Sequence, residues 1–206
     1  MSRDMPDETA RPKRSICAIT PVFNRRDLTL DCLRTLFESD LGGLDLHCIV
    51  VDDGSSDGSA AAIADAFPQV EIITGDGTLW YSEGTNVGIR SALLRDPDYM
   101  LLYNNDSRFP RDALQKLVSC AERHPSSLVG GVLIDWDQPE RIFQVGTQWQ
   151  TGYGGWRTWE RQTVASLPDR PFAVETIGGS CMLVPTQAMR ECGLMKAEAM
   201  PNFGDA

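Results

Sequence analysis

The sequence predicts an α/β protein with a mostly parallel sheet and helices on both faces of that sheet. Short apolar runs typical of buried strands alternate with longer segments that have helical periodicity. Gly, Asp, Asn and Ser residues, which favour turns, follow the ends of several runs. Strands that alternate with helices form parallel pairs joined by right-handed crossovers.

Two strand and helix pairs open the predicted domain. Ile16–Phe23 is a largely apolar run and predicts a strand, and Leu28–Glu38 has the spacing of an amphipathic helix. Leu46–Val51 predicts the second strand. The alanine-rich segment Ser59–Phe67 predicts the second helix.

Two further pairs follow along the chain. Val70–Thr74 predicts a third strand and Glu83–Leu94 a third helix. Tyr99–Tyr103 predicts a fourth strand, and Arg111–Arg123 predicts a fourth helix whose start is marked by Pro110.

The two ends of the chain differ from this alternating region. Residues 1–14 are charged and proline-containing without periodicity, so we expect a disordered tail. After residue 126 the pattern changes: Val129–Ile134 predicts a fifth strand, and Gly178-Gly179-Ser180 opens the apolar run Cys181–Val184. We expect residues 15–126 and 127–206 to be two halves of one continuous domain.

The composition indicates which classes of protein this chain can belong to. The 206 residues are 42% hydrophobic, which is ordinary for a globular domain, and the formal net charge is −10. An acidic chain with few basic clusters does not predict a nucleic-acid partner. No apolar stretch reaches the ~20 residues of a transmembrane helix, and the first ten residues are polar. We therefore expect a cytoplasmic protein without a transmembrane segment.

The six cysteines are scattered and form no C-x-x-C pair. Only two histidines could join them as zinc ligands. The spacing does not predict a zinc site, and reduced thiols in the core are the better interpretation.

Polar side chains gather where the predicted strands end. Asp52 and Asp53 follow the second strand, and Asn105 and Asp106 follow the fourth. In a parallel sheet these ends share one edge, where α/β proteins bind ligands. Two bare carboxylates ~4 Å apart would repel by roughly 4 kcal/mol, so they need a cation, a proton or hydrogen bonds. Asp and Asn oxygens suit Mg²⁺ or Mn²⁺, whereas a single cluster of this kind is equally typical of a structural turn.

Taken in order, six segments resemble the successive signatures of family 2 glycosyltransferases with a GT-A fold, which has a Rossmann-like sheet. The ordered set is far more specific than any one segment. The segments are Thr20–Arg25, Val51–Gly58, Asn86–Gly88, Asn104–Asp106, Gly178–Pro185 and Gly204–Ala206.

The resemblance implies roles for individual residues. Asp53 would contact the nucleotide base, with Asp52 beside it, and Asp106 would hold Mg²⁺ or Mn²⁺ against the donor diphosphate. Asn104 replaces the first acid of the family's D-x-D motif. Asp205 matches the acceptor-side acid that acts as general base. The remaining residues expected to bind the donor are Pro21, Val22, Asn24, Asn86 and Asn105.

The resemblance also implies a function. It predicts a metal-dependent, inverting transfer of a sugar from a UDP, dTDP or GDP donor to a hydroxyl of a glycan or lipid-linked acceptor, in polysaccharide or cell-surface glycan synthesis. Residues 15–126 would be the nucleotide-sugar-binding half and residues 127–206 an acceptor-side half that lacks the family's C-terminal portion. A lipid-linked acceptor would place the protein peripherally at the inner face of the membrane. The segment Gly77–Tyr81 is most similar to rhamnosyltransferase-like members, which favours a deoxysugar.

Two alternatives stay open at this point. A sugar-phosphate nucleotidylyltransferase uses a similar sheet, but its Gly-rich basic loop after the first strand is not matched by Thr20–Asn24. A non-catalytic nucleotide-binding module is the alternative outside the enzymes, because the metal motif has lost one acid.

Overall fold

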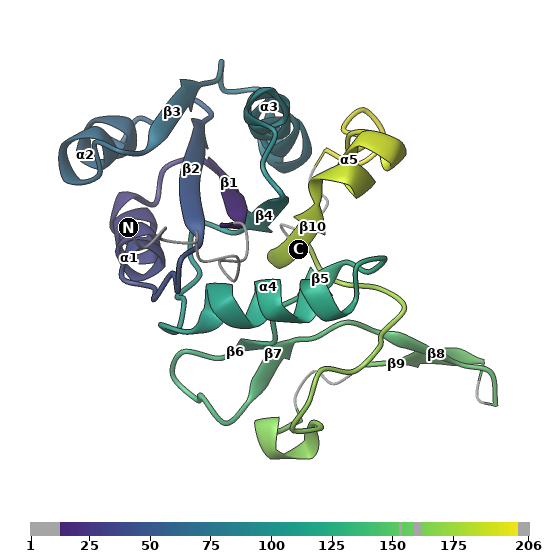
Figure 1. The fold of residues 1–206 in the computed structure, drawn as a ribbon. Coiled ribbons are helices and arrows are strands. Elements are labelled where there is room, and N and C mark those ends of the chain that lie inside the picture. The colour runs from purple at the N-terminus through teal and green to yellow at the C-terminus, as the bar shows by residue number, and fades with distance from the viewer. Residues whose placement is uncertain (1–12, 153, 159–161, 202–206) are drawn as a thin grey trace, which may run out of the picture.

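The computed structural model describes residues 13–152, 154–158 and 162–201. Its main sheet has six strands in the order β3-β2-β1-β4-β10-β5 (Figure 1). The first four of these are mutually parallel, and β10 is antiparallel to both of its neighbours. The prediction of a mostly parallel sheet is confirmed. The strands are β1 (Ser15–Val22), β2 (Asp45–Asp52), β3 (Glu71–Thr74), β4 (Tyr99–Tyr103), β5 (Val129–Gly130) and β10 (Cys181–Pro185).

Helices cover both faces of the sheet, as predicted (Figure 1). Alternate residues of each strand face opposite sides, so Ala18 and Leu101 pack with α1, α2 and α4, whereas Ile19 and Leu102 pack with α3 and α5. The sheet is therefore the middle layer between two hydrophobic cores. The helices are α1 (Arg26–Phe37), α2 (Ser59–Ala66), α3 (Trp80–Arg95), α4 (Ala113–Arg123) and α5 (Thr186–Cys192).

The chain between α4 and β10 forms smaller elements beside the main sheet. Two short antiparallel pairs, β6 with β7 and β8 with β9, lie below α4 in the view of Figure 1. The predicted strand Val129–Ile134 is instead divided. Its first two residues join the main sheet as β5, and its last two form β6. The smaller elements are β6 (Leu133–Ile134), β7 (Ile142–Gln144), β8 (Gln148–Gln150), β9 (Gly155–Arg157) and the 3₁₀ helix η1 (Val164–Ser166).

The predicted strand divides next to Gly131, which packs closely against β10. A Cβ at this position would lie 3.0 Å from the Cys181 Sγ atom, and the Gly131 N–H donates to the Cys181 carbonyl. The absence of a side chain at Gly131 therefore permits this close approach.

Most cysteines lie in the core as free thiols, as the sequence predicted. Cys17, Cys48 and Cys181 are buried. Burial raises the pKa of the Cys17 and Cys48 thiols to about 12 and that of Cys181 to about 11. Cys192, at the end of α5, is exposed. Since the thiolate is the reactive form, the buried thiols are chemically inert.

A network of polar side chains lies at the amino-terminal end of β3. The Glu71 carboxylate accepts hydrogen bonds from Ser91 (2.6 Å) and Arg95 (2.7 Å), and it contacts His47 at 2.9 Å. Burial alone would raise the pKa of Glu71, but the bonds from Ser91, His47 and Arg95 outweigh it and lower this pKa to about 2. The network stabilises the charged carboxylate and ties β2 to α3.

The first described residues are also fixed to the domain. Arg14 donates to Asp98 (2.9 Å) and to Glu122 (3.1 Å). Among the helices that the structure describes, none combines the length and apolar character that a membrane crossing requires.

Candidate functional site

Asp53 is buried behind the loop that joins β3 to α3, and only 6% of the residue is exposed. One carboxylate oxygen accepts a hydrogen bond from the N–H of Gly77 (2.8 Å), and the other accepts from the N–H groups of Leu79 (2.9 Å) and Trp80 (3.0 Å). The first N–H groups of a helix have no partner within it. Asp53 therefore caps α3 from a neighbouring strand.

Asp52 shapes the turn that follows β2. Its Oδ1 atom accepts a hydrogen bond from the Ser55 N–H (2.9 Å). Gly54 has a φ of 78°, and a Cβ there would lie 3.2 Å from the Gly77 Cα. Because the two glycine backbones are in contact, the turn after β2 and the loop after β3 form one continuous surface.

The turn after β1 is fixed to the same segment. The Asn24 N–H donates to the Ser55 Oγ (2.7 Å), and its Oδ1 accepts from the Ser56 N–H (2.9 Å). The Asp57 carboxylate accepts from the Arg26 N–H at 2.9 Å, at the start of α1. Asn24 therefore joins the first two strand ends into a single edge.

Pro21 and Val22 form the end of β1 and are in contact with the elements around the edge. The Val22 carbonyl accepts the Asp53 N–H at 2.8 Å. A Cβ on Gly84 of α3 would lie only 2.9 Å from the Pro21 Cβ. The glycine thus lets α3 approach the strand end directly.

Two exposed carboxylates at this edge accept hydrogen bonds from nearby loop residues, and Asp57 also accepts one from the start of α1. The Ser59 hydroxyl and the Arg26 N–H lower the pKa of Asp57. The Thr78 hydroxyl and N–H lower the pKa of Asp76. Both side chains are therefore engaged in shaping turns.

Asn86 is 2% exposed and bonds to a distant segment of the chain. Its Oδ1 accepts from the Met195 N–H (2.9 Å), and its Nδ2 donates to the Met195 carbonyl (3.0 Å). One turn earlier, the Ser82 hydroxyl donates to the Met200 carbonyl (2.6 Å) and the Ser82 N–H to the Pro201 carbonyl (3.0 Å). This face of α3 therefore holds residues 195–201 against the domain.

The three residues after β4 point to different partners. Asn105 donates from Nδ2 to the Thr29 Oγ1 of α1 (2.8 Å). The Asn104 N–H donates to the Ser180 carbonyl (3.2 Å), and its Oδ1 is buried without a partner among the described residues. The Asp106 carboxylate contacts the Arg25 guanidinium at 3.3 Å.

A divalent cation fits this edge only in part. The described residues contain no group of three or more His, Cys, Asp and Glu side chains that could hold a metal. Mg²⁺ sites of phosphate-transfer enzymes need only one or two carboxylates, because waters and phosphate oxygens complete them. Asp106, with the unpartnered Asn104 oxygen nearby in the chain, fits a cation that is held jointly with a diphosphate.

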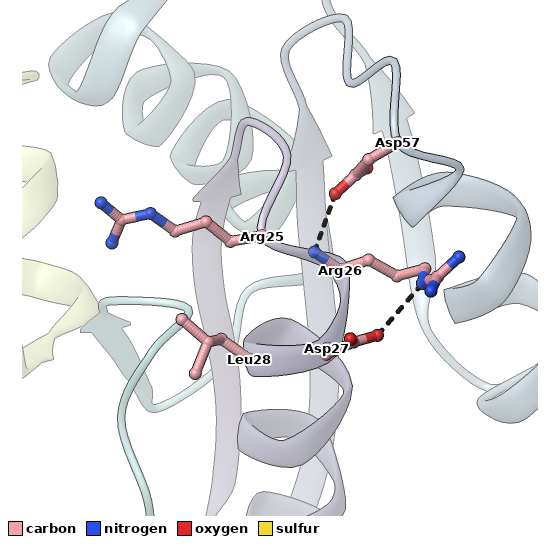
Figure 2. Close-up of a pocket in the computed structure, with 5 residues that line it drawn as sticks. All are labelled: Arg25, Arg26, Asp27, Leu28 and Asp57. Carbon is pink, nitrogen blue, oxygen red and sulfur yellow. Dashed lines mark hydrogen bonds and ion pairs between the residues drawn. The ribbon is translucent and has the colours of Figure 1, made fainter.

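A shallow depression of about 310 Å³ lies over the first turn of α1 (Figure 2). Its lining residues are Arg25, Arg26, Asp27, Leu28 and Asp57. Figure 2 shows the Arg25 and Arg26 side chains extending in opposite directions, with Arg26 close to Asp27.

The structure thus brings most predicted residues to one edge. Pro21, Val22, Asn24, Asp52, Asp53, Asn105 and Asp106 lie at or directly after the carboxyl ends of β1, β2 and β4, as the sequence predicted. Asn86 is placed one to two turns into α3. Asp205 lies outside the described residues, so its role stays a prediction.

Two residues at this edge were missed as site candidates. Arg25 forms the ion pair with Asp106, and Trp80 is 60% exposed beside the Asp53 carboxylate. Both have a positive φ, 58° and 55° respectively. Such strained backbone is rare outside glycine and gathers at functional sites, but sequence periodicity carries no sign of it.

Comparison with solved structures identifies the same fold in glycosyltransferases. A mannosyltransferase from Pyrobaculum calidifontis, solved with GDP-Man and Mn²⁺, is 18% identical with a TM-score of 0.59, covering 94% of this chain and 50% of that one. S. aureus TarS (1–349) with UDP-GlcNAc is 13% identical with a TM-score of 0.56, covering 86% and 47%. The chain therefore spans about half the length of these structures. The predicted GT-A fold is confirmed.

The sequence profile described as glycosyl transferase family 2 matches residues 17–190, and no curated protein sequence matches the chain. The protein belongs to glycosyl transferase family 2.

Proposed function

We propose that the protein transfers a sugar from a nucleotide diphosphate sugar to an acceptor hydroxyl with inversion at the anomeric carbon. One observation carries this proposal. In a chain of this family, the Asp52-Asp53 and Asn105-Asp106 pairs follow β2 and β4, the two strands that flank β1, and the Asn24 turn after β1 joins the same edge.

The nucleotide would bind over the ends of β1 and β2. An ionised carboxylate has about four acceptor positions, and Asp53 uses three of them for backbone N–H groups. The fourth position suits a base N–H. Asp52, Pro21 and Val22 would complete the base and ribose pocket, and the loop before α3 would face the sugar.

The reaction needs charge stabilisation at the departing diphosphate and a base at the acceptor hydroxyl. Mg²⁺ or Mn²⁺ held through Asp106, with the Asn104 oxygen nearby in the chain, would supply Lewis-acid stabilisation of the leaving group. Asp205 would accept the acceptor's proton. Asn86 and Ser82 support this assignment, because they hold the segment that ends four residues before Asp205.

The relatives guide the choice of donors. The solved structures were determined with GDP-Man or UDP-GlcNAc, so UDP, GDP and dTDP sugars are the donors to test, with a deoxysugar favoured. The acceptor would be a glycan or lipid-linked sugar, met in the cytoplasm or at the inner face of the membrane.

A thermal-shift screen of these donors tests the function, because a bound ligand raises apparent stability. We expect one donor to stabilise the protein with Mn²⁺, and Asp106→Asn to lose the Mn²⁺-dependent part of that gain. In a full-length protein, Asp205→Asn should lower transfer by roughly 10²–10⁴-fold at nearly constant donor affinity. Wild-type transfer by the Asp205 variant would reject the general-base role.

The second candidate is a nucleotide-binding module without catalysis. The observation that favours it is the single carboxylate of the metal motif, which already contacts Arg25. Donor binding without donor hydrolysis, with and without Mn²⁺, would select this candidate.

A further inference from the structure

Among the described residues, Arg25 is the one partner that forms an ion pair with Asp106, the sole carboxylate of residues 104–106. The Arg25 Nη1 lies 3.3 Å from the Asp106 Oδ2, and 64% of the arginine side chain is exposed. An exposed ion pair of this kind contributes little to stability, because water and salt screen both charges. Arg25 can therefore leave Asp106 at little energetic cost when a better anion arrives.

The backbone holds Arg25 in a strained conformation. Asn24 and Arg25 are consecutive residues in the left-handed region, with φ values of 59° and 58°. Residues other than glycine adopt this conformation rarely, because their Cβ atom then lies too close to the following carbonyl oxygen. Asn24 is fixed by a hydrogen bond from its N–H to the Ser55 hydroxyl and by one from the Ser56 N–H to its side chain, and the Arg26 N–H donates to Asp57.

This strained turn separates two adjacent arginines. Arg26 extends toward Asp27 and pairs with it at 3.1 Å, whereas Arg25 extends the other way (Figure 2). Arg25 pairs with Asp106. The turn thus delivers one guanidinium to the end of β4. The same loop that carries Asp52 and Asp53 enforces this placement.

A diphosphate bound at this acidic edge would need a cationic side chain as a partner. The acids there include Asp52, Asp53 and Asp76, and a donor diphosphate would add further negative charge. Arg108, close to Asp106 in the chain, is already paired with Asp31 and stacked on the Trp136 ring at 3.6 Å. Of Arg25 and Arg108, Arg25 is therefore the arginine that is better placed to bind a diphosphate.

From these contacts we infer that Arg25 is a diphosphate-binding residue that holds the Asp106 carboxylate until the donor binds. In the donor-free protein its guanidinium competes with a divalent cation for Asp106. When the donor and cation arrive, the cation takes the carboxylate and Arg25 donates its planar pair of N–H groups to phosphate oxygens. This inference rests on the proposed function, because it assigns the anion to the donor's diphosphate.

The test uses Arg25→Ala, with Arg25→Gln as a second variant if the first does not fold, and Arg26→Ala as the matched control. UDP, dTDP and GDP, and the corresponding nucleosides, are titrated by calorimetry in EDTA. In the absence of nucleotide, free Mn²⁺ is followed by electron paramagnetic resonance. Circular dichroism and thermal unfolding confirm that each variant is folded.

We expect Arg25→Ala to weaken the bound nucleoside diphosphate about tenfold to a hundredfold, which is the range of a lost hydrogen bond to a charged group. The corresponding nucleoside should bind with unchanged affinity. Mn²⁺ binding without nucleotide should tighten about twofold to fivefold, because the competing ion pair is gone. Arg26→Ala should match the wild type in all three measurements.

Three results would overturn the inference. Unchanged diphosphate affinity in Arg25→Ala, while the wild type binds a diphosphate, would remove the role of Arg25 and leave the proposed function intact. Unchanged Mn²⁺ affinity would show that Arg25 does not compete for Asp106. If the wild type bound none of the three diphosphates in EDTA or with added Mn²⁺, the proposed function would fail and the inference with it.

Discussion

Replacement of Asp53 by alanine should destabilise the domain far more than replacement of its neighbour. The Asp53 carboxylate accepts three backbone N–H groups, two of them at the start of α3, and the residue is 6% exposed. Each hydrogen bond to a charged group contributes about 1.5–3 kcal/mol, and lost bonds are not additive because water partly replaces them. We expect Asp53→Ala to lower the free energy of unfolding by about 3–5 kcal/mol.

Asp52→Ala is the matched control for this prediction. Asp52 is buried to a similar degree, with 4% exposed, but among the described residues its carboxylate accepts one hydrogen bond, from the Ser55 N–H, instead of three. Its loss should cost about 1–2 kcal/mol. Urea unfolding followed by circular dichroism measures both values, and hydrogen exchange of residues 77–82 should accelerate only in the Asp53 variant.

The outcome that would refute this reasoning is a pair of variants whose unfolding free energies agree within about 0.5 kcal/mol. Unchanged exchange at residues 77–82 in Asp53→Ala would have the same meaning. Either result would show that the cap of α3 does not depend on the carboxylate. Calorimetry of the folded variants in EDTA then tests the base contact, since Asp53→Ala should weaken a free nucleoside diphosphate without any metal.

Three further predictions follow from contacts elsewhere. Because the folded pKa of Glu71 is about 2, below its usual 4.5, the wild type should lose about 1–2 kcal/mol between pH 4.5 and 2 that Glu71→Gln does not lose, as acid unfolding would show. Asn86→Ala should accelerate hydrogen exchange around Met195 while leaving β1 and β2 protected, and uniform exchange would contradict the contact. A thiol reagent should label Cys192 first, and Cys192→Ser should remove this rapid phase.

Local patterns in the sequence were sufficient for the strands and most helices. The predicted Tyr99–Tyr103 agrees with β4 in both bounds, and Ile16–Phe23 differs from β1 by one residue at each end. A buried strand is recognised by its own apolar run, so no distant contact is needed to find it. The same holds for α4, whose periodicity follows a proline.

The predicted start of the third helix, Glu83, was wrong by three residues, because α3 begins at Trp80. The error has a physical reason. The segment Gly77–Leu79 contains no side chain that caps the helix, and the capping oxygens belong to Asp53, more than twenty residues earlier. Pattern rules search for a cap beside the helix. A cap supplied by another strand is invisible to them.

The candidate site likewise has one part that the sequence predicts and one part that it does not. Parallel topology alone predicts that Asp52, Asp53, Asn105 and Asp106 share an edge, and the structure places them there. The pairing of Arg25 with Asp106 joins residues 81 positions apart in the chain. No spacing rule specifies such a partner, because it depends on a strained turn after β1.

The place of β10 in the sheet determines when the sheet can be completed during protein synthesis. β10 lies between β4 and β5, so β4 has no partner on that side until residues 181–185 have been made. Until then the β4 edge has unpaired backbone N–H and C=O groups, and its apolar side chains are not yet covered. Such an edge can pair with other chains. The sheet can therefore be completed only after residues 181–185 have been made, and its first four strands alone leave the β4 edge unpaired.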